Sequence, residues 1–504
     1  MEECLMETLS FIGNLITFNN VLAIFIGTFI GIILGALPGC TPSLGLAIFI
    51  PITYAMDPVT ALIYLGSIYA GGMYGGTITA ILINVPGTAA AAAATIEGYK
   101  MTQHGRASEA LTEAACSSLF GNLFGTFVLL FMAPPLAKLT FKFGPQDNFM
   151  LAVFGLTVIA SLSAKNLLKG IIAGLFGLLI ACVGMDPMLG RARLIMGQRL
   201  LIAGIPLVPV VIGLFAFAMV LVTLGKKADG KAVETKKVKV QFHLRLKDLF
   251  RYPVTYIRSA IIGTIVGIIP GTGGEVASYV SLNQGYMWRG KYRTQKDIET
   301  GWREGIACVQ AADSAVTGGS IIPTLTLGVP GNATTAILLS GLMIHGLTPG
   351  YELFTKHASI TYPFILSLFF AALICSAVGI LCSNYIAKIT ETPPNILASC
   401  IMGLCVVGAF CIRNNLIDLW IMFAFGLIGY GMKLLKFDIA PVLLGIILGK
   451  LAEIGISQSL VMEKSLGKVF LSMTTRPICM ILLALMVLSV AYPFISAHLS
   501  KKKA

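Results

Sequence analysis

Long apolar stretches separated by short polar segments run along most of this sequence. Many of them approach the roughly 20 residues that cross a bilayer as a helix. Others end early at a Pro-Gly pair, and the short apolar stretches 43–56 and 273–287 each follow such a pair. The alternating pattern of an outer-membrane barrel is absent. We therefore predict an all-α polytopic membrane protein with broken helices and re-entrant hairpins.

A basic segment at residues 225–258 divides the sequence into two halves. It holds ten Lys or Arg and three acids, so it supplies seven of the thirteen net positive charges. About seven or eight apolar segments lie on each side of it. A basic segment beside membrane spans is typical of a cytoplasmic loop. We predict a membrane repeat at 1–224, a basic cytoplasmic linker at 225–258 and a second membrane repeat at 259–504.

The composition agrees with a membrane location and indicates which classes of partner the protein binds. Of the 504 residues, 56% are hydrophobic and only 12% are charged, too few charges to cover a soluble domain of this size. The charges of the linker favour contact with the headgroups of anionic membrane lipids. They predict no nucleic-acid binding, because no stacking aromatics or known module accompany them.

Pro-Gly pairs occur at corresponding positions in the two halves. Residues 31–40 read GIILGALPGC and residues 263–272 read GTIVGIIPGT, with glycines and proline at the same spacing. Residues 74–90 read YGGTITAILINVPGTAA and residues 317–334 read TGGSIIPTLTLGVPGNAT, with a difference of one residue in spacing. Paired interruptions of this kind point to the binding site of a secondary transporter. For Gly27, Gly31 and Gly35, close helix packing is the alternative interpretation.

The distribution of cations predicts that the two halves enter the membrane from opposite sides. The first Lys or Arg is Lys100, and the N-terminus carries Glu2, Glu3 and Glu7, so we place the N-terminus outside. The second half follows the basic linker and therefore starts inside. The two structural repeats are predicted to be inverted, an arrangement compatible with an elevator-type fold.

A helix break at Pro-Gly exposes groups that bind ions. Proline removes a backbone donor, and the helix that follows begins with free N–H groups and a positive dipole end. Such ends attract anions, while the carbonyls of the broken turn coordinate cations. Because no Lys or Arg occurs in 1–99, 259–288 or 304–355, helix ends and neutral donors are predicted to hold the anion. The candidate substrate-binding residues are Pro38, Gly39, Thr41, Ser43, Asn84, Pro86, Gly87, Thr88, Pro270, Gly271, Thr272, Gly273, Pro330, Gly331, Asn332 and Thr334, with Thr335 beside them.

Two acids in apolar surroundings are candidates for binding a coupling cation, Na⁺ or H⁺. Glu275 lies five residues after Pro270, and Asp313 lies in a predicted loop just before the Gly318-Gly319 pair. Ionisable groups inside a membrane are costly and usually functional. The alternative is that both acids face water at the end of a loop.

Enzyme and metal motifs are missing from the sequence. It contains no nucleotide-binding P-loop, no HExxH zinc motif and no nucleophile elbow, and its five histidines are scattered. We therefore predict neither an enzyme nor a metal site, and no cofactor beyond the coupling ion.

Three stretches carry a family resemblance that covers almost the whole chain. They are residues 35–99, residues 267–279 with the sequence GIIPGTGGEVASY, and residues 318–350. In these stretches the sequence resembles the large membrane subunit of the tripartite tricarboxylate transporters, the TctA family. The resemblance implies cation-coupled import of di- and tricarboxylates such as citrate across the bacterial inner membrane. It also implies two partners, a small membrane subunit and a periplasmic substrate-binding protein.

The chain departs from the family pattern at a few positions. Gln310, Asp313 and Ser314 stand where the family favours a Glu and an Asn-Asn pair, so Ser314 joins the candidates for the coupling ion. Asn332 stands where Ser is common, and Lys100 replaces a usual proline. These departures bear on the substrate and the coupling ion rather than on the family.

Two other functions remain open. A stand-alone carboxylate symporter would work without a binding protein. A membrane scaffold would not transport at all, and it would have no need of four matched helix breaks.

Overall fold

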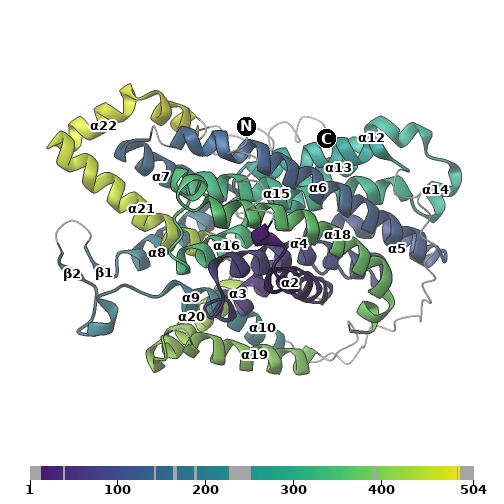
Figure 1. The fold of residues 1–504 in the computed structure, drawn as a ribbon, viewed down its shortest axis with the longest axis horizontal. Helices are drawn as coiled ribbons and strands as arrows, with labels where there is room; N and C mark the ends of the chain where they lie inside the picture. The colour runs from purple at the N-terminus through teal and green to yellow at the C-terminus, as the bar shows by residue number, and fades with distance from the viewer. Residues whose placement is uncertain are drawn as a thin grey trace.

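The computed structural model describes residues 13–37, 40–140, 143–162, 167–186, 190–225, 251–389, 394–411, 413–484 and 486–487. These residues are almost entirely helical (Figure 1), which confirms the all-α prediction. The helices of the first half are α2 (Phe18–Ala36), α3 (Pro42–Thr53), α4 (Pro58–Ile83), α5 (Ala92–Gln103), α6 (Ala107–Thr140), α7 (Pro145–Leu162), α8 (Leu167–Ala181), η1 (Arg199–Leu201), α9 (Leu207–Val211), η2 (Ile212–Phe217, a π-helix) and α10 (Ala218–Gly225). A two-stranded antiparallel sheet joins β1 (Gly184–Met185) to β2 (Ala192–Arg193).

The second half has two short helices directly ahead of its long core helix, whereas in the first half the core helix α4 follows α3 directly. Its helices are α12 (Pro253–Ile268), α13 (Gly273–Arg289), η3 (Gly290–Tyr292), α14 (Gln295–Thr300), α15 (Arg303–Leu327), α16 (Ala333–Ile344), α17 (Tyr351–Thr355), α18 (Ala358–Ile389), α19 (Pro394–Cys411), α20 (Leu416–Leu434), α21 (Ala440–Glu463) and α22 (Leu466–Thr475). In both halves a helix, a break, a second helix and the long core helix (α4 or α15) precede the second break. The inverted orientation of the halves stays a prediction.

Six helices of the described chain are long and apolar enough to cross a membrane. They are α2, α6, the continuous helix Leu207–Gly225, Ala358–Cys382 within α18, α20 and α21. A pair bent by 84°, Leu466–Thr475 and Pro477–Ala484, is a further candidate. The core helices α4 and α15 fall outside this set because glycine, hydroxyl and other polar residues lower their mean hydropathy. The protein is a multi-pass membrane protein, with fewer strongly apolar spans than the sequence segments suggest.

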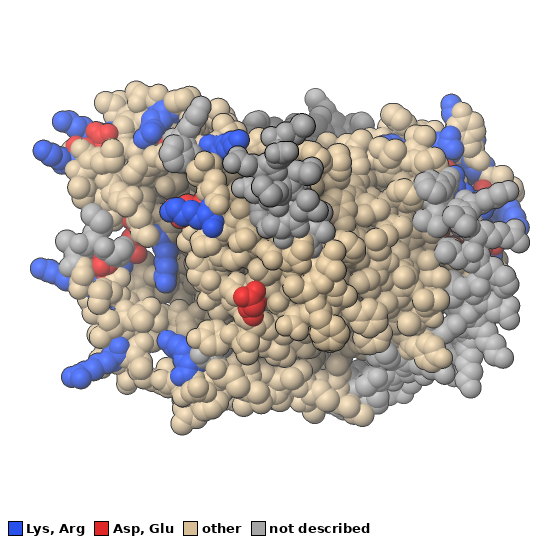
Figure 2. Space-filling view, in the orientation of Figure 1, with Lys and Arg blue, Asp and Glu red and all other residues tan. Residues whose placement is uncertain are grey.

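The surface is apolar where a soluble protein would be polar. On α12, Val254 and Ile265 are exposed, while Ser259 and Gly263 on the opposite face are buried. Figure 2 shows one face of the molecule almost free of charge across its broad centre, with Lys, Arg, Asp and Glu gathered toward its ends. This distribution fits contact with lipid, because lipid tails are apolar and exposing apolar side chains to them carries no free-energy penalty.

Glycines hold each core helix against its neighbour. A Cβ at Gly31 or Gly35 of α2 would overlap backbone carbonyls of α4, and one at Gly263 of α12 would overlap the carbonyl of Ala312 on α15. Backbones approach this closely only where side chains are absent. The glycines ahead of the first and third breaks therefore serve helix packing, the alternative given above. Helix α6 of the first half packs on α15 of the second half, and α18 of the second half packs on α4 of the first half. Each core helix is therefore covered by a helix from the other half.

The predicted linker lies mainly outside the described residues. Residues 226–250 are not described, and α12 begins at Pro253, inside the predicted segment 225–258. The Glu2, Glu3 and Glu7 side chains are also outside the described residues.

Candidate functional site

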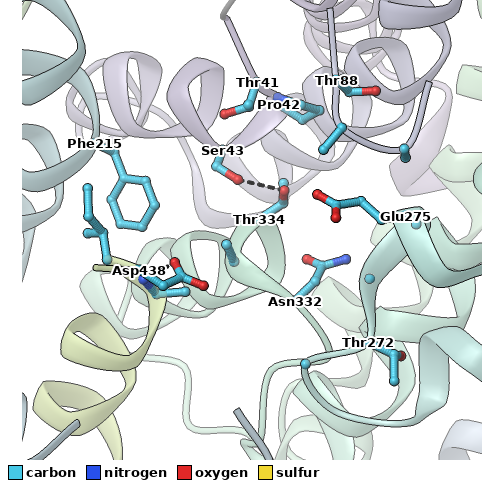
Figure 3. Close-up of a pocket in the computed structure, with 18 of the residues that line it drawn as sticks. Thr41, Pro42, Ser43, Thr88, Phe215, Thr272, Glu275, Asn332, Thr334 and Asp438 are labelled. Carbon is cyan, nitrogen blue, oxygen red and sulfur yellow. Dashed lines mark hydrogen bonds between the residues drawn. The ribbon is translucent and has the colours of Figure 1, made fainter. Parts of the chain in front are cut away.

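All four helix breaks meet around one cavity of about 510 Å³ (Figure 3). Each break contributes a short segment to its wall. The segments are Thr41–Ser43, Thr88–Ala90, Gly271–Val276 and Asn332–Thr334. Met73 of α4 completes this part of the lining, and the remaining residues come from η2, α20, α21 and the link between α20 and α21.

Two helix N-termini face each other across this cavity. Helix α3 begins after the first break with Thr41 as its N-cap, and α16 begins after the fourth break with Asn332 as its N-cap. The hydroxyls of Ser43 and Thr334, each one residue into its helix, share a hydrogen bond of 2.8 Å. The first N–H groups of a helix have no intrahelical acceptor, and its dipole is positive there. Two such ends around one cavity favour an anion.

The cap at Asn332 is tied to the core of the protein. Its side-chain oxygen accepts from the N–H of Thr335 at 2.9 Å, and the Thr335 hydroxyl accepts from the N–H of Asn332 at 3.0 Å. Its amide nitrogen donates to the hydroxyl of Tyr69 at 2.7 Å, and that hydroxyl also bonds to Ser320 at 2.9 Å. The N-terminus of α16 is therefore held in place from α4 and α15.

The second break is formed by a left-handed residue and a tight turn. Asn84 ends α4 at a φ of 58°, and its side chain is exposed. The N–H of Gly87 donates to the carbonyl of Gly76 at 3.2 Å, and the Thr88 hydroxyl accepts from the N–H of Ala91 at 3.1 Å. Thr88 is buried and lines the cavity, while Gly87 packs against α2 and α4 behind it.

The third and fourth breaks are bonded to each other. The N–H of Gly271 donates to the carbonyl of Gly331 at 2.6 Å. Gly271 and Gly273 have φ values of 84° and 64°, which side-chain-bearing residues rarely adopt. The Thr272 hydroxyl donates to the carbonyl of Val266 at 2.5 Å, so it satisfies a carbonyl that the end of α12 leaves open.

The structure brings most of the predicted polar residues to the cavity. Those that line it are Thr41, Ser43, Thr88, Gly271, Thr272, Gly273, Glu275, Asn332 and Thr334. Those that lie behind the wall or away from it are Asn84, Pro86, Gly87, Pro270, Pro330, Gly331 and Thr335. Pro38 and Gly39 lie outside the described residues. Among the described residues, the prolines of the breaks lie outside the lining, and the residues that follow each break face the cavity.

Asp313 lies in the middle of α15, which corrects the predicted loop. The helix runs through the Gly318-Gly319 pair without a break, because these glycines let the backbones of α6 and α12 approach. Asp313 is fully buried, and within the described chain neither of its carboxylate oxygens has a hydrogen-bond partner. It does not face water, whereas Glu275 is exposed at the cavity.

The surroundings of Asp313 connect it to the cavity wall. A Cβ on Gly274 would overlap its Oδ1, and Gly274 lines the cavity. The hydroxyl of Thr317, one turn along α15, is also buried without a partner among the described residues. Ser314 is fully bonded instead, to Ser118 at 2.8 Å and to the amide nitrogen of Gln310 at 3.0 Å.

Sequence reasoning missed the wall that contains Lys433. Lys433 in the last turn of α20 and Asp438 in the link to α21 both line the cavity, together with Phe215 and Phe437. The wall therefore carries charged side chains beside the helix ends and neutral donors that were predicted to hold the anion. No local pattern marks these residues, because Lys433 is more than 90 residues from the nearest break.

Comparisons with known proteins give a consistent result. The model of the tripartite tricarboxylate transporter TctA family matches residues 21–444. An uncharacterized 52.8 kDa protein from the TAR-I ttuC' 3' region of Agrobacterium vitis is 32% identical over 483 residues, which cover 96% of this chain and 95% of that protein. A second uncharacterized protein, from the TAR-II ttuC' 3' region of the same organism, is 26% identical over 240 residues, 48% of this chain and 97% of that protein. No solved structure matches. The chain belongs to the tripartite tricarboxylate transporter TctA family.

Proposed function

We propose that this chain is the large permease subunit of a cation-coupled, secondary-active importer of di- and tricarboxylates of the citrate type. The observation that carries the proposal is the meeting of four helix breaks at one cavity. A carboxylate in this cavity can accept hydrogen bonds from the helix N-termini and from neighbouring hydroxyls. The family membership supports transport rather than a scaffold or an enzyme. We place the protein in the bacterial inner membrane.

The proposed partners are a small membrane subunit and a periplasmic binding protein that delivers the substrate. The word tripartite in the family name supports them. A stand-alone symporter is the alternative. Vesicles that contain this chain and the small subunit should take up a labelled tricarboxylate only when the substrate-loaded binding protein is added on the periplasmic side. Equal uptake without that protein would favour the stand-alone symporter.

We propose Asp313 as the site of the coupling cation. An isolated carboxylate in a buried position is costly unless a proton or a cation neutralises it. The nearby Thr317 hydroxyl offers one more oxygen ligand. Asp313 touches the wall at Gly274, and its charge also reaches Tyr69, which bonds to the cap of α16. Binding of a cation here would therefore act on the third and fourth breaks. Glu275 at the cavity remains a second candidate, and the bonded Ser314 a weaker one.

Replacing Thr88 with valine is expected to weaken substrate binding about tenfold or more. Thr88 lines the cavity and its hydroxyl can donate a hydrogen bond, which contributes about 1.5–3 kcal/mol when the acceptor is charged. Half-saturation of uptake and of substrate binding measures the effect. Thr157→Val is the matched control, because the Thr157 hydroxyl donates to the carbonyl of Val153 in its own helix and Thr157 does not line the cavity. Equal half-saturation in both variants would remove Thr88 from the site.

The orientation of the chain is testable by cysteine labelling. We expect an impermeant thiol reagent applied from the periplasm to reach a cysteine introduced at the N-terminus. It should not reach a cysteine in place of Ala232, because the basic segment is predicted to lie in the cytoplasm. The parent protein gives the background from its own cysteines. The reverse pattern of labelling would contradict the predicted inversion of the repeats.

A further inference from the structure

We propose that Lys433 binds a carboxylate of the transported anion and so sets the affinity of the cavity for anionic substrates. The inference rests on the proposed function and deepens it, since it assigns the charge that recognises the substrate. It concerns a residue on α20, outside the helix breaks that form the rest of the wall.

The side chain of Lys433 lies between α10 and the cavity. Its Nζ lies 3.4 Å from the Sδ of Met219 on α10, and the side chain is half-buried in the lining of the cavity. Lys433 lines the same cavity as Thr41 and Ser43 of the first break, so its ammonium shares this cavity with the N-terminus of α3.

The charges around the cavity indicate where an anionic substrate binds most favourably. Among the described residues that line it, Lys433 is the one cation, while Glu275 and Asp438 are acids. The two acids also interact electrostatically with each other. A carboxylate substrate is repelled by both, so the favourable place for it is near Lys433 and the N-termini of α3 and α16.

The groups that line the cavity come from different sides of it. Figure 3 shows Phe215 and Asp438 on one side of the cavity, Glu275 on the other, and Ser43 and Thr334 between them. Phe215 and Lys433 line the same cavity, and an ion pair is stronger where apolar side chains exclude water. An anion held by the lysine shares this cavity with the paired hydroxyls of Ser43 and Thr334, which can donate hydrogen bonds to it.

The test compares charge at this position in the complete transporter. We expect Lys433→Met to raise the half-saturation concentration for uptake of a labelled tricarboxylate about tenfold or more. Lys433→Arg should recover most of the affinity, because it restores the charge with a different shape. Lys436→Met, three residues away and outside the lining, is the matched control and should behave like the parent. Unchanged half-saturation in Lys433→Met at parental membrane levels would overturn the proposal.

A second measurement covers the case in which Lys433→Met does not reach the membrane. Lys433→Cys can be given a positive charge after folding with an aminoethyl methanethiosulfonate, or a neutral group with a methyl methanethiosulfonate. We expect only the aminoethyl reagent to restore affinity, and the treated parent reports effects on its own cysteines. Equal affinity after both reagents would overturn the proposal. If the parent itself takes up no carboxylate, the proposed function fails, which is a separate outcome.

Discussion

Replacing Asp313 with asparagine is expected to abolish most of the dependence of uptake on a cation gradient. The substitution keeps the shape of the side chain and removes the buried charge that needs a proton or cation. Gradient-driven accumulation should fall roughly tenfold or more, since the ion no longer binds with the substrate. Substrate affinity should change less, because Asp313 lies behind Gly274 and does not line the cavity.

Uptake into vesicles with imposed Na⁺ or pH gradients measures this effect and identifies the ion. Glu352→Gln is the control, since Glu352 pairs with Lys356 in an exposed position. If uptake by the variant depends on the gradient as uptake by the parent does, Asp313 is a structural residue. Glu275 would then be the candidate for the cation site.

Replacing Gly87 with alanine is expected to be the most damaging of the substitutions at the breaks. The new Cβ would overlap the carbonyl oxygen of Gly35 and lie 2.9 Å from the Cα of Gly76. Neither backbone can move easily, and overpacking costs about 1–3 kcal/mol even where side chains can adjust. We expect less folded protein in the membrane, a Tm several degrees lower and loss of uptake.

Graded variants test the cause. At Gly331 the nearest atom to a new Cβ is the Cβ of Ser320 at 2.6 Å, so Gly331→Ala should be milder than Gly87→Ala. Gly403 in α19 has open space around it, and Gly403→Ala should behave like the parent. Thermal unfolding in detergent, followed with and without substrate, measures the order. Normal stability of Gly87→Ala with lost substrate binding would place Gly87 at the substrate instead.

The helix breaks could be predicted because their cause is local. A Pro-Gly pair favours the end of a helix, and the polar residues that follow it cap the next helix. Thr41 and Asn332 show this pattern, and the matched spacing in the two halves suggested that the breaks meet. The packing role of Gly31 and Gly35 was likewise one of the two interpretations that the spacing allowed.

The rest of the site depends on tertiary packing that no local pattern carries. The Gly318-Gly319 pair resembles a break in the sequence, yet α15 continues because its neighbours fill the space that side chains would need. Lys433 reaches the cavity only because α20 packs against η2 and α10. Asn84 was predicted as a donor, but its left-handed backbone gives it the role of ending α4.

The bond between Ser43 and Thr334 joins the two halves of the chain at the cavity, and it has a mechanical consequence. A neutral hydrogen bond of this kind contributes about 0.5–1.5 kcal/mol. The glycine-lined contacts of α2 with α4 and of α12 with α15 resist deformation far more strongly, because backbone lies against backbone. The packed helices are thus stiff, and the contact between the halves at the cavity is weaker. If an anion at the proposed site takes over the donors of Ser43 and Thr334, it removes this hydroxyl bond between α3 and α16, so substrate binding would weaken the contact between the two halves at the cavity.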